Sequence, residues 1–122
     1  MAKKILLVDD SDVVRRSVGD VLRLNGFEVT EAADGGAALD LLAAQGTYDA
    51  IITDIMVPEV DGVTLIREAR KDERYTSTPI IVLASKPEPS KVDESEKAGA
   101  TGWLVKPFGD AQLLAELGRV LQ

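Results

Sequence analysis

Five short runs of mostly apolar residues alternate along this chain with longer segments whose apolar residues recur at helical spacing. The runs span residues 5–8, 27–32, 49–53, 80–84 and 102–105. Strands that are buried on both faces belong to parallel sheets, and their consecutive strands are joined by crossover helices. The alternation therefore predicts an α/β fold with a doubly wound, five-stranded parallel sheet. From its apolarity we expect the third run to be the central strand.

Turn and capping residues place one helix after each run. The predicted boundary residues are Ser11 or Asp10 and Asn25-Gly26 for the first helix, Asp34 and Gly46 for the second, Asp72 as the end of the third, Pro89 before the fourth and Asp110 as the cap of the fifth. The fourth helix is polar, since Val92 is the one apolar residue between positions 90 and 97. We therefore expect little packing energy to hold it in place.

Length and composition exclude several classes of protein. A chain of 122 residues with no linker is expected to form one domain over residues 1–122. Its net charge of −7 opposes direct binding to nucleic acid, and the lack of Cys and His removes thiol nucleophiles, thiolate metal sites and imidazole bases. No apolar run approaches the roughly 18 residues of a membrane span, and residues 1–4 lead into a strand pattern instead of a signal peptide. We expect a cytoplasmic protein with no membrane partner.

Charged residues follow three of the predicted strands at their carboxyl ends. Asp9 and Asp10 follow the first strand, Asp54 the third and Lys106 the fifth. Because the carboxyl ends of parallel strands line one edge of a sheet, we expect these side chains to converge. Three carboxylates and one ammonium group suggest a site for a divalent hard cation and a phosphoryl group.

Each of these residues also has a plainer interpretation. Asp9 and Asp10 could serve a helix N-terminus, Asp54 could be a turn residue, and Lys106 could be a solvated strand-end lysine. Their conjunction favours a metal site, because clustered carboxylates repel one another unless a cation joins them. Mg²⁺ is the natural candidate, since it prefers oxygen ligands and is held by one or two carboxylates with phosphate oxygens. The peptide bond from Lys106 to Pro107 can be cis, which would fix the direction of the ammonium group.

These residues lie within five short motifs that together resemble a known family. The motifs are Leu6-Leu7-Val8-Asp9-Asp10, Thr53-Asp54-Ile55-Met56-Val57-Pro58 with Asp61-Gly62, Thr78-Pro79-Ile80-Ile81-Val82-Leu83, Lys97-Ala98-Gly99-Ala100 and Val105-Lys106-Pro107-Phe108. In order and spacing they resemble the receiver domain of two-component response regulators, over essentially the whole chain. The resemblance implies a CheY-like, flavodoxin-like (βα)5 fold.

The resemblance also implies a role for each site residue. Asp54 would be the phosphoacceptor for a histidine kinase or a histidine phosphotransfer protein. Asp10, Asp54 and the backbone carbonyl of Met56 would hold Mg²⁺, and Asp9 would assist through water. Lys106 would pair with Asp54 and then with its phosphoryl oxygens. Such a protein is no metabolic enzyme, but it would catalyse its own phosphoryl transfer and a slow autodephosphorylation.

One position departs from the family pattern. Where receivers usually carry a Thr or Ser that hydrogen-bonds the phosphoryl group, this chain has Ala84, and the hydroxyl comes one residue later at Ser85. Trp103 stands where the family places an aromatic residue that turns inward. Three interpretations are open: Ser85 reaches the phosphoryl group through a shifted loop, its backbone N–H acts alone, or signalling uses other motions. Trp103 could equally be a half-buried aromatic that packs on a neighbouring helix.

Two functional classes, with a weaker third, follow from the sequence. The first is a phosphorylation-dependent signalling module, and the second is a degenerate receiver that acts as a phosphorylation-independent interaction domain, which only Ala84 supports. A flavodoxin-like redox module is weaker, because its first loop would be rich in Ser, Thr and Gly. We expect a downstream target or a second copy to bind the fourth helix, the last strand and the last helix, with Trp103 and Lys97 at the centre of that surface.

Overall fold

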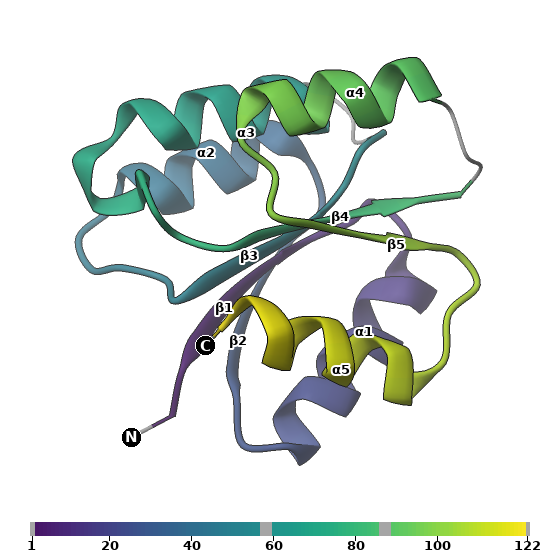
Figure 1. The fold of residues 1–122 in the computed structure, drawn as a ribbon. Helices are drawn as coiled ribbons and strands as arrows, with labels where there is room; N and C mark the ends of the chain where they lie inside the picture. The colour runs from purple at the N-terminus through teal and green to yellow at the C-terminus, as the bar shows by residue number, and fades with distance from the viewer. Residues whose placement is uncertain (1, 57–59, 86–88, 122) are drawn as a thin grey trace.

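The computed structural model describes residues 2–56, 60–85 and 89–121, with Pro89 and Ser90 described by their backbone alone. Five strands alternate with five α-helices (Figure 1). In chain order the elements are β1 (Lys4–Val8), α1 (Asp12–Leu24), β2 (Glu28–Ala32), α2 (Gly35–Ala43), β3 (Ala50–Asp54), α3 (Gly62–Lys71), the 3₁₀ helix η1 (Glu73–Tyr75), β4 (Ile80–Ala84), α4 (Pro89–Ala98), β5 (Gly102–Val105) and α5 (Asp110–Val120).

All five strands are parallel and lie in the order β2-β1-β3-β4-β5. The predicted fold class is therefore confirmed, and β3 is the central strand as its apolarity indicated. Each predicted strand agrees with the structure to within one residue at either end. The strand order reverses its direction between β1 and β3, and this reversal opens a ligand-binding edge beyond their carboxyl ends.

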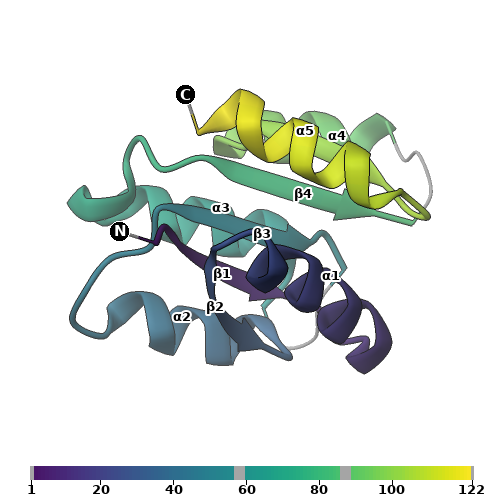
Figure 2. The same ribbon diagram turned by 90° about the horizontal axis from the view of Figure 1, so that it is seen from below.

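Helices cover both faces of the sheet and make two separate cores. Helices α2, α3 and α4 lie on one face and α1 and α5 on the other, as Figures 1 and 2 both show. Alternate residues of each strand enter the two cores: Leu6 and Val8 of β1 face the α2–α4 side, whereas Ile5 and Leu7 face α1 and α5. No helix in the described ranges is both long and apolar enough to cross a membrane.

Capping residues set the starts of α1 and α2 as the sequence predicted. Two other boundaries differ from the prediction, since α2 already ends at Ala43, before Gly46, and α4 begins at Pro89 instead of after it. Of the two candidates for α1, Ser11 is the cap, and its side chain accepts a hydrogen bond from the backbone N–H of Val14 at 3.2 Å. The predicted cap of α5 was wrong by one residue, because Gly109 occupies the cap and Asp110 is already in the first turn. The side chain of Gln112 accepts a hydrogen bond from the Gly109 N–H at 3.0 Å, so the cap needs no side chain of its own.

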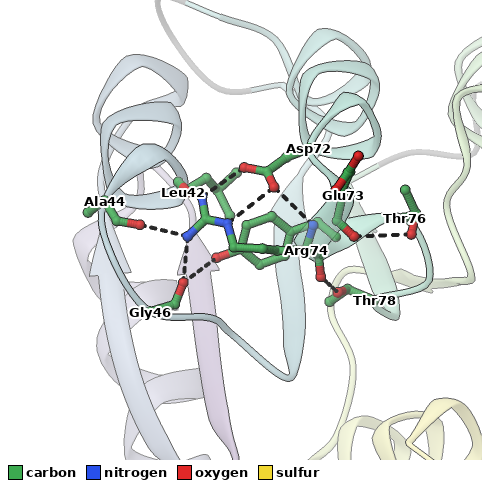
Figure 3. A network of polar contacts seen from close by, with 9 residues as sticks. Leu42, Ala44, Gly46, Asp72, Glu73, Arg74, Thr76 and Thr78 are labelled. Carbon is green, nitrogen blue, oxygen red and sulfur yellow. Dashed lines mark hydrogen bonds and ion pairs between the residues drawn. The ribbon is translucent and has the colours of Figure 1, made fainter.

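Arg74 of η1, an element that the sequence pattern did not predict, closes the carboxyl end of α2 (Figure 3). Its guanidinium donates to the carbonyls of Leu42, Ala44 and Gly46 at 2.5 to 2.8 Å and is paired with Asp72 at 2.7 Å. Carbonyls at the end of a helix lack partners within the helix, and a cation there also complements the helix dipole. Arg74 therefore joins α2 to the segment before β4.

Helix α4 is held to the rest of the fold by polar contacts more than by apolar burial. From position 91 to 98 the one fully buried residue is Ser95. Its hydroxyl donates to the carbonyl of Val92 and accepts the indole N–H of Trp103, each at 2.8 Å. At the carboxyl end of the helix, the guanidinium of Arg70 donates to the carbonyl of Gly99 at 2.6 Å. The expectation of weak apolar packing thus agrees with the observed contacts.

Candidate functional site

The structure brings Asp9, Asp54 and Lys106 together at the carboxyl edge of the sheet. Lys106, 97 positions after Asp9, extends its ammonium group across the end of β4. Its Nζ lies 2.8 Å from Asp9 Oδ2 and 2.8 Å from Asp54 Oδ2. The three strand ends predicted to converge do so.

Asp9 is completely buried, and each of its polar groups has a protein partner. Its N–H donates to the carbonyl of Ala32 at 3.1 Å, and its carbonyl accepts Nη1 of Arg15 at 2.7 Å. Its Oδ1 accepts the N–H of Ser11 at 2.9 Å, while Oδ2 is bound to Lys106. Because both carboxylate oxygens are already engaged, this residue suits an indirect role at a metal site better than a direct one.

Asp10 differs from Asp9 in being exposed. One carboxylate oxygen from each of Asp9, Asp10 and Asp54 can be chosen so that all three lie within 4.8 Å of one another. A cluster of oxygen donors with one solvent-facing carboxylate fits Mg²⁺, which retains several waters and takes few protein ligands. The described residues therefore fit the predicted ion, and Asp10 and Asp54 are the two carboxylates best placed to bind it.

The carboxylates also control the charge of the lysine. Burial alone would lower the pKa of Lys106, but the hydrogen bonds and negative charges of Asp54 and Asp9 outweigh burial and raise the pKa above its ordinary value of 10.5. Lys106 is thus fully cationic at neutral pH. It supplies one positive charge to a site with three negative ones.

Backbone geometry fixes the other side of Asp54. Its Oδ1 accepts the N–H of Met56 at 3.1 Å, and the side chain of Met56 is 61% exposed. The role of the Met56 carbonyl as a metal ligand stays a prediction, and Val57 and Pro58 of the same motif lie outside the described residues. A Cβ on Gly62 would stand 2.7 Å from the carbonyl oxygen of Asp54, so only glycine permits this approach of α3 to the end of β3.

The residues related to the departure from the family pattern, Ala84, Ser85 and Trp103, lie in different surroundings. Ala84 ends β4 and is buried, and its carbonyl accepts the N–H of Lys106 at 2.8 Å. Ser85 is exposed. Trp103 is half-buried on the α4 side of β5 and bound to Ser95, as the interpretation of a packed aromatic expects. The peptide bond between Lys106 and Pro107 is cis.

Two features of the site were missed by sequence reasoning. The first is Arg15. Its position one turn into α1 could have indicated a role at the site, because a side chain there points back toward the loop that precedes the helix. The second is an open groove of about 430 Å³ that Lys106 helps to line. Its walls come from α1 and from the segments after β4 and β5, and they consist of Val13, Val14, Ser17, Val18, Ser85, Lys106, Pro107 and Phe108.

Comparison with known proteins gives one consistent result. A model of the response regulator receiver domain matches residues 5–118. The chemotaxis protein CheY of Pseudomonas aeruginosa is 40% identical over 93% of this chain and 90% of its own length. The structure of the chemotaxis response regulator CheY4 of Vibrio cholerae is 41% identical with a TM-score of 0.92, over 98% of this chain and 99% of that one.

A third match concerns the metal. The receiver domain of the sensor histidine kinase PA1611 from Pseudomonas aeruginosa is 34% identical with a TM-score of 0.91, covers 99% of this chain and 98% of its own, and has a magnesium ion coordinated in its active site cleft. Sequence and fold agree across these proteins. This chain therefore belongs to the response regulator receiver domains of two-component signalling and is CheY-like.

Proposed function

We propose that Asp54 accepts a phosphoryl group from a histidine kinase or a histidine phosphotransfer protein in a reaction that requires Mg²⁺. Receivers of this family work between histidine kinases and downstream targets. The observation that carries the proposal is the ion pair of Lys106 with Asp54, which sits beside an exposed carboxylate at Asp10. This set combines a nucleophile, a fixed cation and open oxygen ligands at one place.

The reaction is a phosphoryl transfer between two side chains. An oxygen of Asp54 forms a bond to phosphorus while the bond from phosphorus to the donor's imidazole nitrogen breaks, and the electron pair of that bond leaves with the imidazole. Asp10 and Asp54 would hold Mg²⁺, which when bound would supply positive charge to the transferring oxygens. Lys106 starts within 2.8 Å of Asp54 Oδ2 and can follow the developing charge without a large movement.

Loss of the phosphoryl group requires a water molecule in line with the new bond. Met56 is exposed next to Asp54 and can restrict that approach. Lys86, which follows Ser85 in the sequence and could also restrict that approach, lies outside the described part of the chain. Replacing Met56 with a smaller side chain should therefore change the rate of autodephosphorylation.

The direct test is labelling with a small phosphodonor such as acetyl phosphate. Intact mass spectrometry should show one added phosphoryl group in the presence of Mg²⁺ and none with EDTA. Asp54→Asn should fold and remain unlabelled, because a neutral amide replaces the nucleophilic carboxylate. An unlabelled wild-type protein, under conditions that label another receiver, would favour the degenerate interaction domain instead.

A second test addresses the metal site. Asp10→Ala should bind Mg²⁺ more weakly in calorimetry, because it removes the exposed ligand. Without metal the same variant should melt at a higher temperature, since it relieves repulsion within the carboxylate cluster. A clearly lower melting temperature in EDTA would contradict this view of the site.

We also propose that α4, β5 and α5 form the surface for a downstream target or a second copy, around Trp103 and Lys97. Weak apolar packing of α4 supports this choice, because its docking should respond to small free-energy changes at the end of β4. Amide hydrogen exchange with and without beryllofluoride, a phosphoryl mimic, is the test. Protection changes confined to residues 11–45, with 89–106 unaltered, would place the surface elsewhere.

A further inference from the structure

We infer that Arg15 is a positioning residue of the metal site, which acts by fixing the peptide unit between Asp9 and Asp10. This inference rests on the proposed metal-dependent function. Arg15 is largely buried, with 17% of its side chain exposed. Its Nη1 donates to the backbone carbonyl of Asp9 at 2.7 Å. The contact therefore involves the main chain of Asp9 and not its carboxylate.

A carbonyl oxygen held in place fixes the plane of its peptide bond, because the six atoms of the peptide unit are coplanar. The peptide unit in question ends at the Cα of Asp10, the exposed carboxylate of the cluster. Among the described residues, no hydrogen bond or ion pair to the side chain of Asp10 is found, whereas Asp9 is bound through all of its polar groups. The direction of Asp10 thus depends on the position of Arg15.

Arg15 is itself held by two acidic residues. Its Nη2 is 2.5 Å from Asp12 Oδ1, and its Nε is 3.3 Å from Glu31 Oε1 on the edge strand β2. Glu31 is also paired with Arg23 at 2.7 Å. The guanidinium is therefore held by Asp12 at the start of α1 and by Glu31 of β2. These two contacts fix the direction in which its Nη1 donates to the Asp9 carbonyl.

The sign of the effect separates positioning from simple electrostatics. A cation near a metal site repels the metal, so its removal would strengthen Mg²⁺ binding if charge alone mattered. Loss of orientation acts in the opposite direction, and we expect it to be the larger of the two effects. Partners that orient a ligand usually cost 10- to 100-fold in metal affinity when they are removed. For a weakly held ion with several waters we expect roughly tenfold.

Calorimetric titration with MgCl₂ tests the inference on Arg15→Gln, Arg15→Lys and the control Arg16→Gln, which changes the exposed neighbouring arginine. Arg15→Gln should raise the Kd for Mg²⁺ roughly tenfold, Arg15→Lys should recover part of that loss, and Arg16→Gln should match wild type. At saturating Mg²⁺ the labelling rate of Arg15→Gln should return close to that of wild type, because Asp54 and Lys106 are untouched.

The outcomes are distinguishable. A Kd in Arg15→Gln equal to or lower than that of wild type overturns the inference, even if the variant melts at a lower temperature, because a purely structural role changes stability alone. If Arg15→Gln does not fold, Arg15→Lys decides by the same comparison of Kd values. A wild-type protein that neither binds Mg²⁺ nor becomes labelled would refute the proposed function and with it the inference. A wild type that does both, beside an unchanged Arg15→Gln, would refute the inference alone.

Discussion

The hydrogen bond between Trp103 and Ser95 should be a main anchor of α4. Ser95 is fully buried, and its hydroxyl is the partner of the indole N–H at 2.8 Å. Replacing Ser95 with Ala removes the acceptor and leaves the indole N–H without its protein partner. Loss of a partner from a buried polar group costs about 1–3 kcal/mol. For a chain of this length, about 1 kcal/mol corresponds to a change of about 4 °C in melting temperature.

A competing effect makes the control essential. Alanine favours a helix interior over serine by about 0.5 kcal/mol, which would hide part of the loss. Ser17→Ala makes the same exchange at an exposed position of α1 and so carries the same gain in helix propensity. The difference between the two variants isolates the hydrogen bond, and we expect Ser95→Ala to melt about 4–12 °C below Ser17→Ala.

Thermal unfolding followed by circular dichroism measures this difference, and a double-mutant cycle with Trp103→Phe separates the pair from its surroundings. Phenylalanine keeps an aromatic ring and removes the N–H, so the coupling energy should be about 0.5–1.5 kcal/mol. Equal melting temperatures for Ser95→Ala and Ser17→Ala would refute the anchor. A coupling energy of zero would show that Ser95 stabilises α4 without Trp103.

Two further predictions concern the start of α3. Gly62→Ala would place a Cβ 2.8 Å from the Cα of Ile55. We expect it to lower the free energy of unfolding in urea by about 1–3 kcal/mol. A change near zero would contradict the close approach of α3 to the end of β3. Asp61 caps α3 through the N–H of Thr64 at 2.8 Å, and chiefly this backbone hydrogen bond lowers its pKa below 3.8. The contribution of the charged Asp61 cap to the free energy of unfolding is therefore complete above pH 3.8 and is lost as pH falls through the lowered pKa. Asp61→Ala should thus cost about 1 kcal/mol at pH 7 and progressively less in more acidic solution. A cost that does not change between pH 7 and pH 3 would rule out the charged cap.

The fold could be predicted from the sequence because the local spacing of apolar residues identifies each strand and each α-helix. Apolar runs such as residues 80–84 are too short for helices, and the segments between them have helical spacing, so only a parallel sheet with helices on both faces satisfies both patterns. A helix boundary was mispredicted where the capping residue has no side chain to mark it. Gly109 instead of Asp110 caps α5 because Gln112 supplies the oxygen, and a scan for capping side chains does not find that arrangement.

The acidic part of the site was predictable for a similar reason, since Asp9 and Asp10 follow β1, Asp54 ends β3, and the sheet brings these strand ends together. The contacts of the arginine side chains were not predictable from the sequence. Arg15 and Arg74 act on backbone carbonyls, which every residue possesses, so no pattern of residue types marks their targets. Such contacts depend on the distance between elements after folding.

The central claim is that Asp54 is the phosphoacceptor, and mapping the label tests it most directly. The protein is phosphorylated with acetyl phosphate and Mg²⁺ and then reduced with borohydride, which converts an aspartyl phosphate to homoserine and leaves free aspartates intact. Peptide mass spectrometry should find homoserine at position 54 and unchanged aspartate at positions 9 and 10. Asp54 is paired with Lys106, whereas Asp9 is completely buried with both carboxylate oxygens engaged and Asp10 is not a partner of Lys106 among the described contacts. Homoserine at position 9 or 10, with Asp54 unmodified, would contradict the account.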